Sequence, residues 1–284
     1  MPHQHDHHQH AHPQQTHQHA HPQHTHRQAP VKDAGLLHKY GKWACSGELK
    51  RRNIAFSQYV NLLKNDKFYC FLRFGDGEWW TIFRTTGRIM GQQPLSTKTQ
   101  RDMRGGLIRN SKSSIIFGMQ NYALRTMGDQ IGEFLRNNKL LHIVWTEADT
   151  FHYASRDGKL FPFVQQLRNK KTVIIGPRYL RPLKDQAVDY LKFIEVPKFN
   201  AYGKKREIEA EILATQEEFG DGLVYNFSTG PAANIFMFDL WKKMSKNFFI
   251  DLGSLWDVFC GRRSRRYMNR KDYNSRILKK NLNL

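Results

Sequence analysis

The chain carries the sequence Phe68-Tyr69-Cys70-Phe71-Leu72-Arg73-Phe74-Gly75-Asp76-Gly77-Glu78, and the prediction of its fold starts here. The apolar run Phe68–Leu72 predicts a buried strand, and residues 78–83 predict the first turns of a helix. Two carboxylates, one residue apart and flanked by glycines, therefore follow the carboxyl end of a strand. That edge is where open α/β sheets bind their ligands.

Asp76 and Glu78 form an Asp-x-Glu pair that suits a metal ion. The flanking Gly75 and Gly77 let the backbone turn sharply and approach a ligand closely. Two carboxylate oxygens within reach of one cation suit Mg²⁺ or Mn²⁺ better than zinc. The alternative is a surface turn in which both acids are solvated.

The rest of the chain alternates short apolar runs with longer amphipathic stretches. The runs are continuous, which is typical of parallel strands covered on both faces, and their alternation with helices predicts a doubly wound α/β sheet. The further strands are predicted at residues 114–119, 140–145, 172–176, 193–196, 223–227 and 248–252. Helices are predicted near residues 97–110, 128–137, 158–169, 179–191, 204–219, 231–245 and 254–260.

Composition divides the chain into a tail and one domain. Residues 1–30 are rich in His, Gln and Pro and hold most of the 14 histidines. Such a segment buries too little apolar surface to fold, so a disordered tail with incidental metal affinity is predicted. Residues 31–284 are predicted to form a single α/β domain with a basic C-terminal tail.

The formal net charge is +20. Residues 262–284 contribute heavily to this charge, with many Lys and Arg against the single acid Asp272. A balance of this kind predicts an acidic partner, such as a phosphorylated substrate, nucleic acid or another polyanion bound through the basic C-terminus. Three cysteines without a CxxC pair favour a reducing compartment. No apolar run is long enough to predict a membrane span, so a cytoplasmic protein is expected.

Polar side chains follow several predicted strands and are candidates for the site. Glu147 and Asp149 are candidate bases toward an acceptor hydroxyl, although either is also suited to cap a helix. Arg178 is a candidate for bidentate phosphate contact. Asp251 directly follows the last predicted strand.

Ser228-Thr229-Gly230-Pro231 also follows a predicted strand and precedes a helix. Free backbone N–H groups at a helix N-terminus bind anions, so this loop is suited to a diphosphate. The pattern is neither a Walker A loop nor GxGxxG. An ordinary helix cap by Ser228 or Thr229 is the alternative.

A family resemblance follows from three segments. Arg73-Phe74-Gly75-Asp76-Gly77-Glu78 resembles the signature of the GT-D fold glycosyltransferases, whose Asp-x-Glu motif binds the metal and the sugar nucleotide. Ser228–Ala233 resembles the second glycine-containing loop of that family. Residues 249–257 and the following residues 263–267 resemble its C-terminal Asp-x-Gly segment and basic Arg/Tyr run. The matches occur in the expected order across about residues 50–270.

The resemblance implies a Rossmann-like fold, a nucleotide-diphosphate sugar donor such as a UDP-sugar, and a requirement for Mn²⁺ or Mg²⁺. By position, Asp76 and Glu78 inherit the metal and donor role. Residues predicted to contact the donor are Arg73, Gly75, Gly77, Arg178, Ser228, Thr229, Gly230, Asp251 and Asp257.

The predicted function is a metal-dependent glycosyltransferase. It would move a sugar from a nucleotide diphosphate to a hydroxyl on a glycan, a lipid-linked glycan or a glycoprotein. One alternative is a glycosyltransferase acting on modified bases in DNA. A second is a non-enzymatic nucleic-acid-binding α/β protein that uses its basic C-terminus as a phosphate contact arm. A phosphatase or nuclease using the Asp-x-Glu metal is a further alternative.

Overall fold

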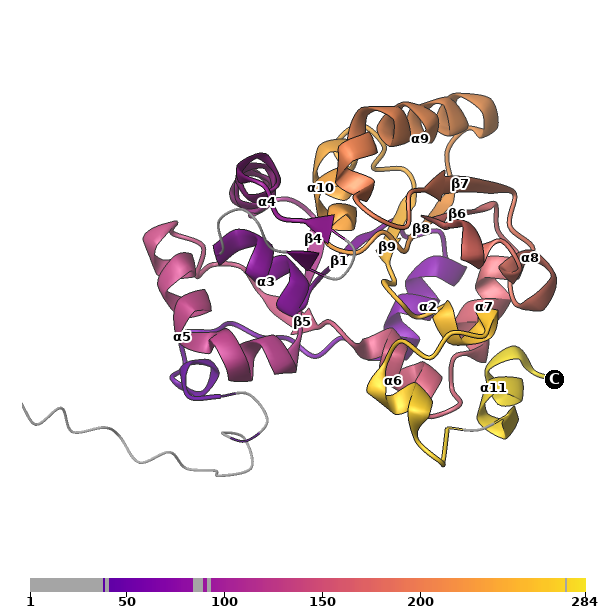
Figure 1. Ribbon diagram of the computed structural model, residues 1–284, viewed down its shortest axis with the longest axis horizontal. Helices are drawn as coiled ribbons and strands as arrows, with labels where there is room; N and C mark the ends of the chain where they lie inside the picture. The colour runs from indigo at the N-terminus through magenta and orange to yellow at the C-terminus, as the bar shows by residue number, and fades with distance from the viewer. Residues whose placement is uncertain (1–37, 39–40, 84–88, 91–92, 274) are drawn as a thin grey trace, which may run out of the picture. The chain divides into compact units, whose positions relative to one another are not determined.

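A seven-stranded parallel β-sheet forms the centre of the fold in a computed structural model of the chain (Figure 1). The structure describes residues 38, 41–83, 89–90, 93–273 and 275–284, all of which belong to the unit Asp33–Leu284. The tail predicted over residues 1–30 lies outside the described residues.

The order of the strands is β5-β4-β1-β9-β8-β6-β7, and every paired neighbour is parallel. The predicted α/β class with a doubly wound, Rossmann-like parallel sheet is thereby confirmed. The strands are β1 (Cys70–Phe74), β4 (Ile115–Met119), β5 (Trp145–Glu147), β6 (Thr172–Pro177), β7 (Lys192–Val196), β8 (Val224–Phe227) and β9 (Phe248–Asp251). A separate antiparallel pair joins β2 (Ile89–Met90) to β3 (Gln93–Pro94).

Helices cover both faces of the sheet, as the continuous apolar strands require. One face packs against α3 (Asp76–Phe83), α4 (Thr97–Asn110), α5 (Asn121–Asn137), α9 (Lys205–Phe219) and α10 (Ala232–Leu240). The other packs against α2 (Phe56–Lys64), α6 (Thr150–Arg156), α7 (Phe161–Arg168), α8 (Leu183–Gln186) and α11 (Ser275–Leu282). None of these described helices has the length and apolar character that a bilayer span requires.

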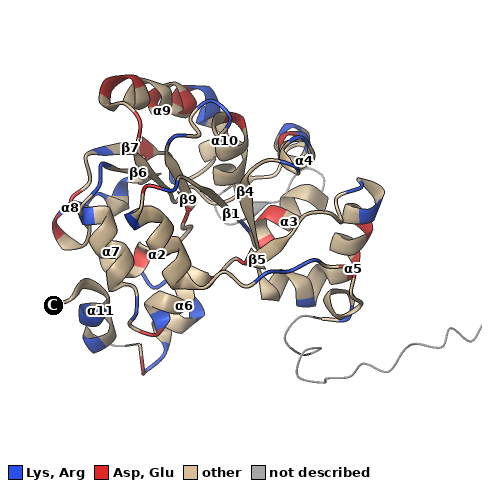
Figure 2. Cartoon of the chain, turned by 180° about the vertical axis from the view of Figure 1, so that it is seen from behind, with Lys and Arg blue, Asp and Glu red and all other residues tan. Residues whose placement is uncertain are grey.

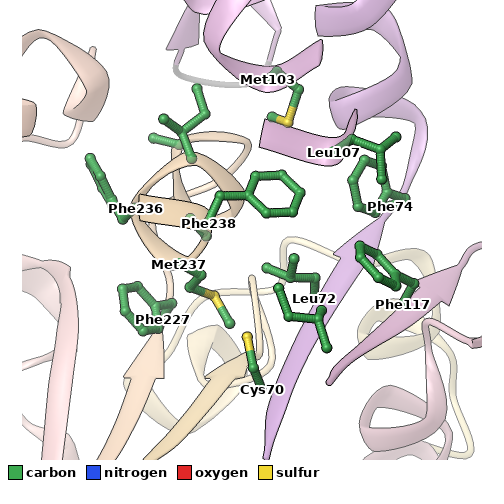
Figure 3. Close-up of a cluster of buried hydrophobic side chains, with 14 of the residues drawn as sticks. Cys70, Leu72, Phe74, Met103, Leu107, Phe117, Phe227, Phe236, Met237 and Phe238 are labelled. Carbon is green, nitrogen blue, oxygen red and sulfur yellow. The ribbon is translucent and has the colours of Figure 1, made fainter. Parts of the chain in front are cut away.

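Alternation along β1 sends its side chains into the two cores in turn. Cys70, Leu72 and Phe74 enter the core on the α4 and α10 face, whereas Phe71 enters the core on the α2 face. The first three lie among apolar side chains of β4, β8, α4 and α10 (Figure 3). This packing fixes the carboxyl end of β1 and with it the segment that carries Asp76.

Two predicted elements differ from the observed ones, and one observed helix was not predicted. The run at residues 140–145 was predicted as a strand, but β5 begins at Trp145, because Leu140 and Ile143 are buried within a turn after α5. Instead of one helix at residues 179–191, the chain forms η2 (Arg178–Leu180) and the short α8. Helix α6 was not predicted; it is short, and it directly follows the loop that carries Asp149.

The basic C-terminal stretch packs back onto the domain through η5 (Arg266–Asn269) and α11. Asn281 is fully buried, accepts a hydrogen bond from the Leu160 backbone N–H at 3.0 Å and donates one to the Ser155 carbonyl at 2.8 Å. The Tyr273 hydroxyl lies 2.9 Å from the Ser155 hydroxyl. These contacts hold the arginines before α11 beside α6.

Two adjacent glycines in α4 allow a matched test of the packing between α4 and α10. A Cβ at Gly106 would overlap the buried ring of Phe238, whereas a Cβ at Gly105 would meet the end of the flexible Arg109 side chain. We expect Gly105→Ala to leave the free energy of unfolding unchanged or raise it by up to about 1 kcal/mol, through helix propensity. Gly106→Ala should instead lower it by on the order of 1 kcal/mol, because overpacking outweighs propensity.

Urea denaturation of both variants measures the difference. Equal stabilities of Gly105→Ala and Gly106→Ala would contradict the described approach of α4 to α10.

Candidate functional site

A cleft of about 370 Å³ lies at the carboxyl edge of the sheet, where the segments after β1, β8 and β9 meet. Strand β9 lies between β1 and β8, and the chain leaves β1 toward α3 on one face and β9 toward η4 (Asp257–Cys260) on the other. Such a switch point leaves a crevice in a doubly wound sheet. Predicted site residues that line the cleft are Arg73, Gly75, Asp76, Gly77, Glu78, Ser228, Thr229, Gly230, Asp251 and Asp257.

The Asp-x-Glu pair occupies the first turn of α3. Glu78 Oε2 accepts a hydrogen bond from the backbone N–H of Gly75 at 2.7 Å, so the helix start is closed by its own side chain. Trp79 anchors the other side of the helix, because its buried indole N–H donates to the sulfur of Met119 at 3.3 Å. The sequence therefore directs Trp79 into the core and the two carboxylates into the cleft.

Burial raises the pKa values of three carboxylates that line the cleft, those of Glu78, Asp251 and Asp257. Burial, reinforced by the negative charge of Asp251, raises the pKa of Glu78 to about 7. Burial raises the pKa of Asp251 to about 6, although the nearby Arg73 guanidinium and the Gly253 backbone N–H, which donates to Asp251 Oδ1 at 2.9 Å, oppose the shift. Burial and the proximity of the two carboxylates therefore oppose the simultaneous ionisation of Glu78 and Asp251.

Arg73 is buried beneath this cleft and connects three strand ends. Its Nε donates to the Ala148 carbonyl at 2.9 Å, and its terminal nitrogen pairs with Asp149 Oδ1 at 2.7 Å. Burial would raise the pKa of Asp149, but the charges of Arg73, His152 and Arg265 and the hydrogen bond from Gln120 together outweigh burial and lower that pKa to about 2. Asn234 of α10 donates to the carbonyl of Arg73 at 2.9 Å, which ties the helix to the same point.

Gly253 lies directly over the Arg73 guanidinium. Its φ of +52° is a left-handed conformation that disfavours other residues, and a Cβ there would lie 2.5 Å from a terminal nitrogen of Arg73. Glycine at this position lets the backbone after β9 pass in direct contact with the Arg73 guanidinium.

The loop after β8 has the character of an anion site. The hydroxyl oxygens of Ser228 and Thr229 are buried, line the cleft and have no hydrogen-bond partner among the described residues. Gly230 follows with a φ of +60° and open space around it, and α10 begins two residues later. Buried hydroxyls without partners are costly, so a ligand that accepts hydrogen bonds here would relieve that cost.

Three predicted site residues lie outside the cleft: Arg178, Glu147 and Asp149, which is paired with Arg73. Arg178 is exposed, and its neighbour Tyr179 lines the cleft instead, with its hydroxyl donating to Asp257 at 2.9 Å. Glu147 does not line the cleft; it accepts from the Asn121 side chain and from the Asp149 backbone N–H. These contacts hold the Glu147 side chain against the residue before α6 and the first residue of α5, without capping α6.

Cleft residues that the sequence analysis did not assign to the site include Gln120, Lys198 and Arg265. The Gln120 side-chain amide donates to Asp149 at 2.9 Å. Arg265 stands in the run of basic residues, but the sequence does not show which of these turns toward the sheet.

The oxygen atoms that line the cleft suit a hard divalent cation whose coordination is completed by a bound ligand. Within the described residues, no three His, Cys, Asp or Glu side chains are grouped so that they alone could hold a metal ion. The carboxylates of Asp76 and Glu78 line one cleft with the hydroxyls of Ser228 and Thr229. Mg²⁺ in such sites is held by one or two carboxylates together with water and phosphate oxygens.

Comparison with known proteins supports the fold assignment. No protein-family model matches the chain, and no curated protein matches it. A solved structure described as a new glycosyltransferase (DUF1792) from Streptococcus sanguinis is similar with a TM-score of 0.53 at 18% identity, over 80% of this chain and 92% of that one. Another, described as the domain of unknown function 1792 with a distinct glycosyltransferase fold, gives 0.52 at 18% identity, over 80% and 90%. The chain therefore shares the fold of these structures.

The raised pKa of Glu78 predicts a dependence of stability on pH. The folded-state pKa of about 7 exceeds the ordinary value of 4.5, so the folded chain binds the extra proton between these values. Stability should therefore fall as pH rises from 4.5 to 7. We expect Glu78→Gln to remove the contribution of Glu78 to this dependence, leaving that of Asp251, and to raise the free energy of unfolding at pH 8 by on the order of 1 kcal/mol.

Thermal unfolding of both proteins at pH 5 and pH 8, without divalent cations, measures this effect. Asp189→Asn is the matched control, because Asp189 is exposed and does not line the cleft. If Glu78→Gln is less stable than the parent chain at pH 8, the ionised Glu78 carboxylate does not destabilise the folded chain, and the prediction is wrong.

Proposed function

We propose that the protein is a metal-dependent glycosyltransferase that transfers a sugar from a nucleotide-diphosphate donor, a UDP-sugar, to a hydroxyl acceptor on a glycan, a lipid-linked glycan or a glycoprotein. The observation that carries the proposal is the meeting of the Asp76 and Glu78 carboxylates with the Ser228 and Thr229 hydroxyls in one cleft. The described activity of the structures that share this fold points in the same direction.

The cleft offers separate places for the parts of such a donor. Ser228, Thr229 and the N-terminus of α10 would bind the diphosphate, because they present unpartnered hydroxyls and the positive end of a helix dipole. Asp76 and Glu78 would hold Mn²⁺ or Mg²⁺ against it. The bound cation would supply charge neutralisation for the departing diphosphate.

Asp251 is the proton acceptor that fits transfer best. In the reaction, the acceptor oxygen bonds to the anomeric carbon, the bond from that carbon to the diphosphate breaks, and the acceptor hydroxyl loses its proton. The pKa of Asp251, about 6, suits a general base near neutral pH. Asp149 was a sequence-based candidate, but its pairing with Arg73 lowers its pKa to about 2 and makes it a weak base.

The nucleic-acid-binding alternative receives less support from the fold. Stacking on bases requires exposed aromatic rings among the basic residues. Tyr273 is buried, and the half-buried Tyr267 packs edge-on against it with 5.1 Å between ring centroids. The two tyrosines of the basic C-terminal stretch therefore serve packing.

The metal requirement is the first prediction of this proposal. The chain should hydrolyse or transfer from a UDP-sugar with Mn²⁺ or Mg²⁺ and lose this turnover with a chelator. Asp76→Asn and Glu78→Gln should each lower kcat/KM by about 100-fold or more, because the cation contributes several kcal/mol to the transition state. Release of UDP measures the activity.

The same measurement on Asp189→Asn tests whether loss of a carboxylate outside the cleft also lowers the turnover. Turnover that persists in chelator, or in both cleft variants, would refute the metal-dependent assignment.

The buried hydroxyl of Thr229 gives a second prediction. Thr229→Val keeps the shape of the side chain and removes a hydroxyl that has no partner in the described structure, so the free energy of unfolding should not fall. The affinity for UDP, measured by calorimetry with Mn²⁺, should drop about 5- to 10-fold through the lost hydrogen bond. Thr126→Val, on the exposed side of α5, is the control. Unchanged UDP affinity in Thr229→Val would exclude this loop from donor binding.

A further inference from the structure

A second pocket, of about 690 Å³, lies between α6 and the chain that leads into η5. Figure 2 shows Lys and Arg on α6 and on the neighbouring C-terminal segment. The pocket is distinct from the donor cleft and was not anticipated from the sequence. The arginines that line it are Arg125, Arg156, Arg265, Arg266 and Arg270.

The charges of this arginine pocket are not balanced by its own lining. Its one carboxylate, Asp149, is already paired with Arg73 at 2.7 Å. Arg156 and Arg270 pair with Asp157 and Asp272, at 2.7 Å and 2.6 Å, in partly or fully exposed positions where such pairs contribute little.

Arg266 is exposed and has no ion pair among the described residues. Each guanidinium carries five N–H donors. The pocket therefore retains both positive charge and donors for a ligand.

Arg265 joins the arginine pocket to the donor cleft. It lines both, and its Nε donates to the Ser254 hydroxyl at 2.6 Å, at the rim of the cleft. On the other side of the boundary, Asp149 lines the pocket and accepts one hydrogen bond from Gln120, which lines the cleft. Side chains of single residues thus separate the two spaces.

The lining also includes aromatic surface of a kind suited to a sugar ring. Tyr153 is 37% exposed, with the Arg156 guanidinium 4.9 Å from its ring centroid. Tyr267 lies edge-on to His152, and its hydroxyl is 3.2 Å from His152 Nδ1. Aromatic bodies with a few oriented polar groups are typical of small-molecule pockets.

We propose that the arginine pocket is an acceptor subsite for a saccharide that carries a phosphate group. The inference rests on the proposed function, because it takes the reaction to occur in the neighbouring cleft. Planar guanidinium groups bind phosphate oxygens through paired hydrogen bonds. The phosphate lies among Arg156, Arg266 and Arg270, and the saccharide extends past Arg265, so that its hydroxyl reaches Asp251. A neutral glycan would leave Arg266, which has no ion pair among the described residues, without a counter-charge.

The test uses the full chain with its donor cleft filled by UDP and Mg²⁺, so that phosphate binding there does not interfere. Calorimetry compares glucose 1-phosphate, glucose linked through a diphosphate to a short prenyl chain, and methyl glucoside. We expect the phosphate-bearing compounds to bind at least about 10-fold more tightly than methyl glucoside, since charge-assisted hydrogen bonds are the stronger ones. Binding of both identifies the phosphate as the recognised group, and binding of the prenyl compound alone identifies a lipid-linked source.

Variants locate the binding. The double variant Arg266→Gln and Arg270→Gln should weaken binding of the phosphate-bearing compound about 10-fold or more and leave UDP affinity unchanged, because neither arginine lines the donor cleft. Lys271→Gln removes the same charge from an exposed neighbour outside the pocket and should change binding less than 2-fold.

Two results would overturn the subsite. One is equal binding of methyl glucoside and the phosphate-bearing compounds. The other is equal binding of the phosphate-bearing compounds by the double variant and the parent chain. The same conclusion holds if an added short DNA duplex displaces these compounds equally from both proteins. Failure of UDP to bind the parent chain would instead refute the proposed function. UDP binding is measured in a separate titration, so this outcome can be distinguished from failure of the sugar phosphates to bind.

Discussion

The buried guanidinium of Arg73 is the constraint on which the site depends. It lies at the end of β1, bonds the Ala148 carbonyl and Asp149 beyond β5, and passes beneath Gly253 after β9. A buried charge is stable only when it is paired and its donors are satisfied, so these three chain segments must meet at one place. The same positive charge opposes the rise in the pKa of Asp251 and keeps Asp149 ionised. One side chain thereby sets both the geometry and the ionisation of the cleft.

The sequence predicted the architecture because most strands of the sheet, namely β1, β4, β6, β8 and β9, are buried along their whole length. The runs that became β4, β6 and β8 are short, continuous and apolar, and the helices between them have the expected period. Periodicity cannot separate a strand from a buried turn, which is why the strand predicted at residues 140–145 begins only at Trp145. The order of the strands was not predictable, since it depends on which edges pair across the chain.

The sequence predicted those cleft residues that directly follow a strand. Asp76, Glu78, Ser228 and Asp251 all line one cleft. Prediction could not reach Arg265 or the arginine pocket, because both arise when the C-terminal segment packs against α6, far away in the sequence. The buried hydroxyls and raised carboxylate pKa values of the cleft also depend on burial, which no local pattern reports. They mark a place where the folded chain is locally unfavourable without a ligand.

The position of β9 has a consequence for biosynthesis. It is the last strand of the sheet in the sequence, yet it lies between β1 and β8 and joins the half-sheet β5-β4-β1 to the half-sheet β8-β6-β7. A nascent chain is made from its N-terminus, so β1 and β8 present open edges until Phe248–Asp251 has been synthesised. Open edges invite pairing with other chains. The two half-sheets can therefore join, and Asp251 can enter the cleft, only late in synthesis. Until then, the open edges of β1 and β8 must be kept from pairing with other chains.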